Sequence, residues 1–145
     1  MVQSISDINL SDKLIKWFLS NKRDLPWRKT KDPYLVWVSE IILQQTRIET
    51  GIKYYHSFIK KYPDVKLLAK SDKQQLLKIW EGLGYYSRAL NMHRAAKQIL
   101  LNHGGVFPKD YLSLINLPGV GDYTASAISS TSVSYTHLRA HETSN

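Results

Sequence analysis

The chain has 145 residues, with 20 Lys and Arg against 12 Asp and Glu, so its formal net charge is +8. This length suits one ordinary domain, and the lack of Cys excludes a disulfide framework, an iron–sulfur cluster and Cys-ligated zinc within these residues. The sequence contains no apolar run of about 18 residues and no signal peptide, so we expect a cytoplasmic protein without a membrane span. The basic charge favours a polyanionic partner such as nucleic acid but names no function.

Apolar residues recur with a helical period and no strand-like alternation is sustained, so the predicted fold class is all-α. A first helix presents one apolar face, made of Leu10, Leu14, Ile15 and Phe18. Asp32 followed by Pro33 is typical of an N-cap and a first helical position, and it predicts a second helix that ends at Leu43. The core positions expected on this second helix are Leu35, Val38, Ile42 and Leu43.

The remaining predicted helices, in chain order, are Ile48–Tyr62, Asp72–Glu81, Tyr86–Asn102, Pro108–Asn116 and one that begins near Asp122. Ser71 and Gln74 form a capping-box pattern at the start of the second of these, and Gly82 is expected to end it. His56 and His93 fall on exposed or mixed helix faces, and we expect no metal site.

Residues 117–121, which read LPGVG, lie between two helical segments in the pattern of a helix–hairpin–helix. Gly119 and Gly121 permit a positive φ, and Val120 is expected to fill the space between the helices. Such a turn directs backbone N–H groups and a helix N-terminus outward, which suits a DNA phosphate. A plain Pro-Gly turn is the alternative, and the small residues after Tyr123 favour the DNA interpretation.

Glu40 is the only charged residue between Asp32 and Arg47. A carboxyl group that is desolvated in an apolar helix has a raised pKa and can hold a proton near neutral pH, as a general acid does. The alternative is an ordinary solvated Glu on a helix surface. The absence of any neighbouring charge weakens this alternative without removing it.

Four runs of sequence now point to a known family: LPWR, VWVSEIILQQTR, WEGLGYYSRA and LPGVGDYTASAI. Over about residues 8–130 the chain resembles the adenine-specific mismatch DNA glycosylases, the MutY family of the helix–hairpin–helix glycosylase superfamily. The resemblance implies a helix–hairpin–helix glycosylase fold with an incomplete six-helix barrel over residues 28–130 and the hairpin motif at 111–130. It also implies that residues 1–27 hold a helix that packs, in the family, on an iron–sulfur subdomain.

The resemblance implies roles for single residues. Glu40 matches the catalytic acid that protonates a flipped adenine, and Tyr123 matches a Tyr that lines the site and supports its carboxylates. Endonuclease III has a nucleophilic Lys at the position of Tyr123, so a Tyr implies a hydrolytic enzyme without a strong lyase step. Trp27 and Arg28 match the adenine pocket, although core packing is the ordinary use of such a Trp.

The resemblance also implies DNA contacts. Gln45 and Tyr85 match residues that are wedged into the duplex, and Thr46 and Leu83 match close contacts of the damaged guanine. The hairpin residues Gly119, Val120 and Gly121 complete the implied DNA-binding set. Without the family motifs, Tyr85 would be read as a core residue, and Gln45 and Thr46 as an exposed helix end. Stacking of an aromatic ring on a base is worth about 1–3 kcal/mol, which offsets part of the cost of base flipping.

The resemblance ends near Thr131. The family's second carboxylate, an Asp, aligns with His141, and Glu142 lacks the surrounding motif. We therefore interpret residues 131–145 as a non-family tail, artefactual or disordered, and the chain as an N-terminal fragment that is inactive because this Asp is missing. No cofactor is expected in this chain, and a 4Fe-4S cluster is expected in the full-length family member.

The predicted function is hydrolysis of the N-glycosidic bond of adenine mispaired with 8-oxoguanine or guanine. The predicted partner is double-stranded DNA with such a mismatch, bound by a monomer that is nucleoid-associated in a bacterium. A non-enzymatic helix–hairpin–helix DNA-binding module and a glycosylase of the endonuclease III or thymine-mismatch type are the alternatives. The Tyr at position 123 counts against the endonuclease III type, and a pure DNA binder has no need of Glu40.

Overall fold

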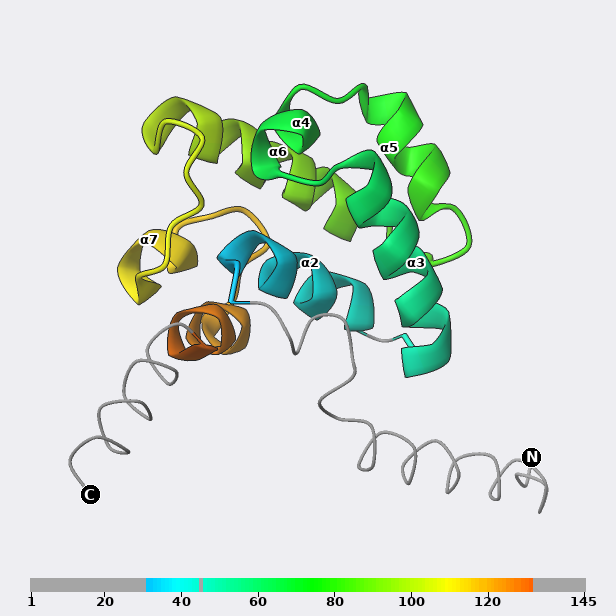
Figure 1. Cartoon of the computed structure of the whole chain (residues 1–145), viewed down its shortest axis with the longest axis horizontal. Coiled ribbons are helices and arrows are strands. Elements are labelled where there is room, and N and C mark those ends of the chain that lie inside the picture. Colours follow the sequence, from blue (N-terminus) through cyan, green and yellow to red (C-terminus); the bar gives the residue numbers. More distant parts are fainter. Residues whose placement is uncertain (1–30, 45, 132–145) are drawn as a thin grey trace, which may run out of the picture. The chain divides into compact units, whose positions relative to one another are not determined.

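The computed structural model describes residues 31–44 and 46–131, and the regular elements in them are all helices (Figure 1). They are α2 (Pro33–Leu43), α3 (Ile48–Lys61), α4 (Val65–Ala69), α5 (Lys73–Trp80), α6 (Ser87–Asn102), α7 (Tyr111–Ile115) and a last helix over residues 122–131, here named the hairpin helix. The all-α prediction is confirmed for these residues. The predicted first helix and residues 132–145 of the predicted tail lie outside them.

Helix α2 begins as the sequence predicts and lies in the middle of the other helices (Figure 1). The Asp32 carboxylate accepts a hydrogen bond from the Tyr34 N–H at 3.0 Å, and Pro33 occupies the first turn. Of the predicted core residues, Val38 and Ile42 are buried, but Leu35 and Leu43 are only partly buried. Trp37 and Ile41, which the predicted stripe left out, are buried instead. Neighbours on several sides therefore cover α2, and its run of apolar residues reflects this burial.

Two predicted helix starts are wrong. The cap of α5 is Asp72, whose carboxylate accepts from the Gln74 N–H at 3.3 Å. Ser71, the predicted cap, instead donates its hydroxyl to the Leu68 carbonyl at 2.6 Å and so closes the preceding helix. Helix α7 starts after Asp110, three residues later than predicted, because the Asp110 carboxylate accepts from the N–H of residue 113 at 3.0 Å.

Helix α4 has no counterpart among the predicted elements. Its five residues follow Asp64, whose carboxylate accepts from the Leu67 N–H at 2.9 Å. Leu68 and Ala69 are buried, and the helix packs against α6. A helix this short spans little more than one turn, so it shows no apolar period in the sequence. Each helix of the described residues is too short or too polar to cross a membrane.

His93, on α6, is buried rather than on the mixed face predicted for it. Its Nε2 donates to the Ser71 carbonyl at 3.0 Å, and this fixes the tautomer because a carbonyl can only accept. Burial is the main cause that lowers the pKa of His93 from its ordinary 6.5. The hydrogen bond to Ser71 and the charge of Asp72 oppose this shift, and Lys97 and Lys73 add to it, so the net direction is downward.

This burial predicts a loss of stability in weak acid. Because the unfolded His93 takes up a proton at its ordinary pKa and the folded one resists it, the free energy of unfolding should fall as pH drops below about 6.5. Urea unfolding of the wild type and of His93→Gln between pH ~7.5 and ~5.5 measures the effect. The variant should lose less stability over this range, and His56→Gln, on an exposed residue of α3, should behave as the wild type does. An equal loss in His93→Gln and the wild type would contradict the assignment.

Candidate nucleic-acid interface and catalytic acid

Residues 117–121 form the predicted turn between α7 and the hairpin helix. The Val120 N–H donates to the Leu117 carbonyl at 3.1 Å, which closes the turn. Val120 is buried, as predicted, whereas Gly119 and Gly121 are exposed. The turn therefore presents backbone to solvent next to the N-terminus of the hairpin helix, an arrangement that suits an anion such as phosphate.

The two glycines of the turn differ in their backbone φ and in the space around their Cβ positions. Gly119 has φ +75°, and a Cβ at this position would lie 2.7 Å from the Cβ of Asn91 on α6. Gly121 does not use the positive φ that a glycine permits, and no atom lies within 4 Å of its Cβ position. Its carbonyl accepts from the Ala125 N–H at 2.9 Å, so it begins the hairpin helix with a backbone that other residues adopt.

Two side-chain hydrogen bonds attach the hairpin helix to its neighbours. The Gln44 amide, at the end of α2, donates to the Thr124 hydroxyl at 3.4 Å. The Tyr111 hydroxyl, on α7, donates to the Asp122 carboxylate. The turn, α7 and the end of α2 are thus tied together.

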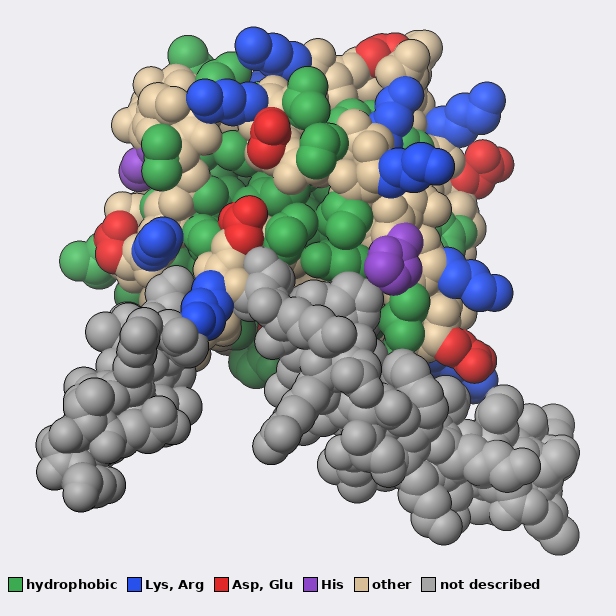
Figure 2. Space-filling view, in the orientation of Figure 1, with side chains coloured by type: hydrophobic (Ala, Val, Ile, Leu, Met, Phe, Trp, Pro, Cys, Tyr) green, Lys and Arg blue, Asp and Glu red, His purple; other side chains and the backbone are tan. Residues whose placement is uncertain are grey.

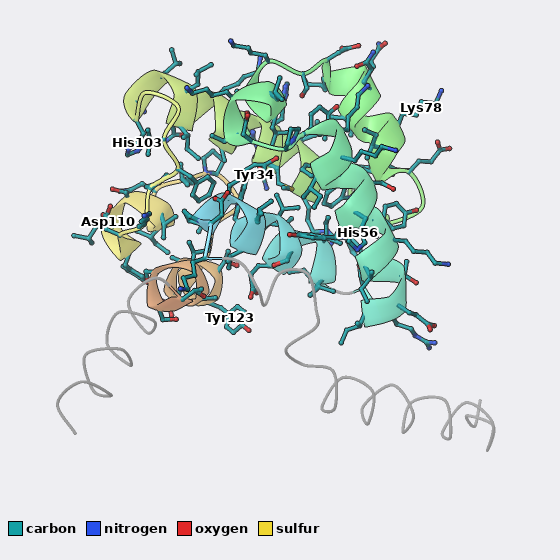
Figure 3. The ribbon with its side chains drawn as sticks, viewed as in Figure 1. Tyr34, His56, Lys78, His103, Asp110 and Tyr123 are labelled. Atoms are coloured by element: carbon teal, nitrogen blue, oxygen red, sulfur yellow. The ribbon has the colours of Figure 1, made fainter. Side chains whose placement is uncertain are left out.

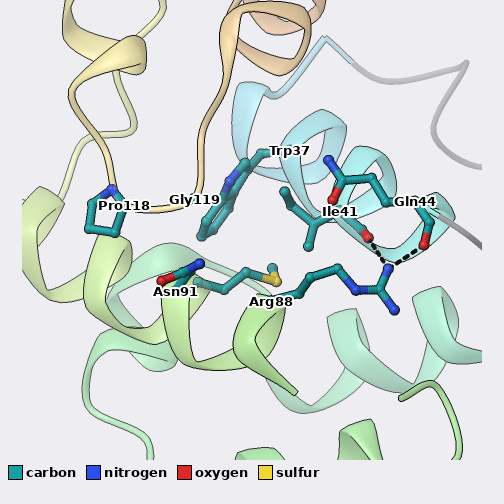
Figure 4. A pocket seen from close by; sticks show the side chains of 8 residues that line it. Trp37, Ile41, Gln44, Arg88, Asn91, Pro118 and Gly119 are labelled. Atoms are coloured by element: carbon teal, nitrogen blue, oxygen red, sulfur yellow. Dashed lines mark hydrogen bonds between the residues drawn. The ribbon is translucent and has the colours of Figure 1, made fainter. Parts of the chain in front are cut away.

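A narrow cavity lies where α2, α6 and residues 118–119 meet (Figure 4). Its volume is about 20 Å³, which accommodates a single water molecule and is far too small for a nucleobase. The Trp37 Nε1, on its wall, is buried without a hydrogen-bond partner. This cavity is therefore not the predicted base pocket, whose residues, Trp27 and Arg28, lie outside the described residues.

Glu40 provides the only carboxylate of α2. It is half-buried, and the residues on either side of it in the chain, Ser39 and Ile41, are buried. The structure thus places this carboxyl group at the edge of the core, less desolvated than the sequence alone suggested. Such a position combines reduced solvation with access for a ligand, which is what a general acid requires.

The loop over residues 81–86 presents Tyr85 to solvent. Tyr85 is 64% exposed and has φ +50°, a left-handed conformation that is unfavourable for a residue other than glycine. The loop is held by the Tyr54 hydroxyl, which donates to the Glu81 carbonyl at 2.5 Å, and by the Trp80 indole, which donates to the Gly84 carbonyl at 3.0 Å. The alternative of a core role for Tyr85 is therefore wrong.

The other predicted DNA contacts fall on the same two segments. Thr46, just after α2, and Leu83, in the loop, are both partly buried. Gln45 lies outside the described residues. The structure joins these segments through Arg88, which donates to carbonyls of both α2 and the loop. The contacts of these residues with DNA remain predictions.

The sequence pattern of the HhH-GPD superfamily of base excision DNA repair proteins matches residues 38–141. The chain belongs to this superfamily. The match includes α2 from Val38 onward, with Glu40, the loop that carries Tyr85 and the hairpin turn. The segments that the structure ties together are therefore parts of a DNA repair domain.

Within the superfamily, the chain is similar to curated adenine DNA glycosylases. The chain is 43% identical over 116 residues to an adenine DNA glycosylase of Buchnera aphidicola subsp. Baizongia pistaciae, a region that covers 79% of this chain and 33% of that protein. It is 40% identical over 126 residues to the adenine DNA glycosylase of Homo sapiens, covering 81% of this chain and 23% of that protein. The chain thus spans a third or less of the length of these relatives.

Solved structures of the superfamily share the fold. A thermostable thymine-DNA glycosylase superposes with a TM-score of 0.72 at 29% identity, over 85% of this chain and 57% of that chain. An endonuclease III from a non-covalent DNA complex superposes with a TM-score of 0.68 at 21% identity, over 92% of this chain and 62% of that chain. The predicted helix–hairpin–helix glycosylase fold is confirmed.

Tyr123, the predicted partner of the catalytic acid, projects from the hairpin helix next to the turn (Figure 3). It is 74% exposed. In this superfamily domain an exposed aromatic ring near the hairpin is available to a ligand, and its role beside the catalytic carboxylate remains a prediction.

Sequence reasoning missed the residues that connect the segments: Tyr54, Arg88, Asn91 and Thr124. For Arg88, one feature of the sequence could have indicated this role. Arg88 is the second residue of α6, where a positive charge is unfavourable beside the positive end of the helix dipole. A local conflict of this kind indicates that the side chain has a partner elsewhere in the fold.

The net charge does not form a single stripe on the face shown in Figure 2. Lys and Arg side chains are spread around its rim with acidic ones between them, and hydrophobic side chains gather near its centre. The basic charge, which favours a polyanionic partner, is therefore not gathered into one track on this face. Local backbone donors at the hairpin are the better candidates for phosphate contacts.

Proposed function

We propose that this chain is the part of an adenine DNA glycosylase that binds the duplex and supplies the catalytic acid. The substrate is adenine mispaired with 8-oxoguanine or guanine in double-stranded DNA, and the reaction is hydrolysis of its N-glycosidic bond. The curated relatives of the chain carry the name adenine DNA glycosylase, which supports this choice of base.

One observation carries the proposal. Helix α2, which holds Glu40, is bonded at its end to the hairpin helix through Gln44 and Thr124. A duplex held by its phosphate at the turn is thereby placed in a fixed relation to the only carboxylate of α2. A DNA-binding module without chemistry needs the turn but has no use for this connection.

The chemistry follows from the charge changes of the reaction. A protonated Glu40 donates its proton to a ring nitrogen of the flipped adenine, and the bond between the base and the sugar breaks with its electron pair leaving on adenine. The sugar becomes an oxocarbenium-like cation, water adds to it and releases a proton to solvent, and the Glu40 carboxylate takes up a proton from solvent. Tyr123, being a phenol rather than an amine, forms no Schiff base with the sugar.

The iron–sulfur cluster expected in the full-length family member does not fit this chain. Such clusters are held by Cys thiolates, and the sequence contains no Cys. The described residues also contain no group of three or more His, Asp and Glu that could hold a metal ion.

A single-turnover assay tests the proposal. The assay compares two proteins. One is the 145-residue chain, and the other, here named the extended chain, keeps residues 1–130 and continues with the residues that the genomic reading frame encodes after Ser130. Alkali cleavage of a duplex with adenine opposite 8-oxoguanine should report base release by the extended chain, and an adenine–thymine duplex should stay intact. Binding of the mismatched duplex without release would favour the non-enzymatic module and contradict the proposal.

A further inference from the structure

Arg88 connects the two segments that carry the predicted DNA contacts. From the first turn of α6, its guanidinium donates to the Ile41 carbonyl at 2.8 Å and to the Gln44 carbonyl, both at the end of α2 (Figure 4). The Ile41 carbonyl also accepts from the Gln44 N–H at 3.3 Å, and both carbonyls belong to the negative end of the helix. The charge of Arg88 therefore stabilises the end of α2, immediately before Gln45 and Thr46.

The same guanidinium contacts the loop that presents Tyr85. It donates to the Gly84 carbonyl at 3.4 Å, and its central carbon lies 5.6 Å from the centre of the Tyr85 ring and 5.3 Å from that of Trp80. Both ring distances are within the range of cation–π attraction. One side chain thus joins the end of α2 to Gly84 and to the exposed ring of Tyr85.

We propose that Arg88 is a positioning residue that fixes Tyr85 relative to the end of α2, so that Tyr85 enters the duplex in register with the catalytic helix. This inference rests on the proposed function. Its physical basis is preorganisation: Tyr85 is exposed and has an unfavourable φ, so its orientation has to be imposed by its surroundings. A planar guanidinium can serve several acceptors and two ring faces together, which the single ammonium of a Lys cannot.

The test measures base unstacking separately from binding. The fluorescent base 2-aminopurine, placed beside the adenine–8-oxoguanine mismatch, brightens when its neighbours unstack. The extended chain is added at a concentration that saturates the duplex. Under this condition Arg88→Met should reduce the increase in 2-aminopurine fluorescence by about fivefold, because Tyr85 enters the base stack less often. The dissociation constant should change by less than about threefold, because phosphate contacts supply most of the affinity. Lys97→Met, an exposed residue further along α6, removes the same charge and should leave the rise unchanged.

A double-variant comparison separates positioning from a general structural role. If Arg88 acts through Tyr85, adding Arg88→Met to Tyr85→Ala should cause no further loss of the fluorescence rise. Additive losses, or a normal rise in Arg88→Met, would overturn the inference. Arg88→Lys, which keeps the charge, should also show a much smaller increase in fluorescence. This second variant still tests the inference if Arg88→Met fails to fold. Absence of any rise in the wild type, despite binding, would count against the proposed function and remove this inference with it.

Discussion

Glu40→Gln in the extended chain should lower the single-turnover rate of adenine release by about 10²–10⁴-fold, the usual contribution of a general acid. The amide is close in size to the carboxyl group and cannot donate a proton to the leaving base. Because Glu40 is half-buried and not part of the hairpin turn, the affinity for the mismatched duplex should change little. The rate is followed by alkali cleavage, and the affinity by fluorescence anisotropy.

Glu49→Gln serves as the matched control. This residue lies in the first turn of α3 and is exposed, so its replacement makes the same Glu-to-Gln change on a neighbouring helix. Its rate should equal that of the wild type. An unchanged rate in Glu40→Gln would show that Glu40 is an ordinary surface residue of α2 and would remove the acid from the proposed mechanism.

Gly119→Ala should have the largest effect on DNA binding. An Ala at φ +75° costs about 1–2 kcal/mol, and its Cβ would collide with Asn91, so the turn has to move. Loss of the phosphate contact should weaken binding of both matched and mismatched duplexes by about tenfold or more, since hydrogen bonds to charged groups are worth about 1.5–3 kcal/mol. Anisotropy with the two duplexes measures this change.

Gly121→Ala gives the comparison within the same turn. Its φ is not positive and open space surrounds its Cβ position, so binding and stability should stay close to those of the wild type. Gly119→Ala combined with Asn91→Ala leaves the φ cost and the 2.7 Å contact with the Asn91 Cβ in place. It should therefore recover little of the lost binding. Equal effects of the two glycine replacements would contradict the geometry of the turn.

Helices set by local chemistry could be predicted from the sequence. Asp32 and Pro33 mark the start of α2 by themselves, because an N-cap and a first-turn Pro act within a few residues. Helix α3 has a strong apolar face and starts at Ile48, as predicted. Where two capping residues are adjacent, as at Ser71 and Asp72, local rules do not decide between them. Asp72 caps α5, while the Ser71 hydroxyl donates to the Leu68 carbonyl.

The candidate site was predictable as separate motifs but not as an assembly. The turn at Gly119 and the acid at Glu40 follow from residue types and from the family resemblance. The contacts that unite them are non-local, as between Arg88 and Ile41, 47 residues apart, and between Gln44 and Thr124, 80 residues apart. No spacing in the sequence indicates such pairs, since they form only when the helices pack.

Identification of the released base tests the proposed function most directly. A mixture of two duplexes, one with adenine opposite 8-oxoguanine and one with thymine opposite guanine, is incubated with the extended chain, and free bases are identified by mass spectrometry. An adenine glycosylase with Glu40 as its acid releases adenine alone. Release of thymine, or of neither base while both duplexes are bound, would contradict the assignment.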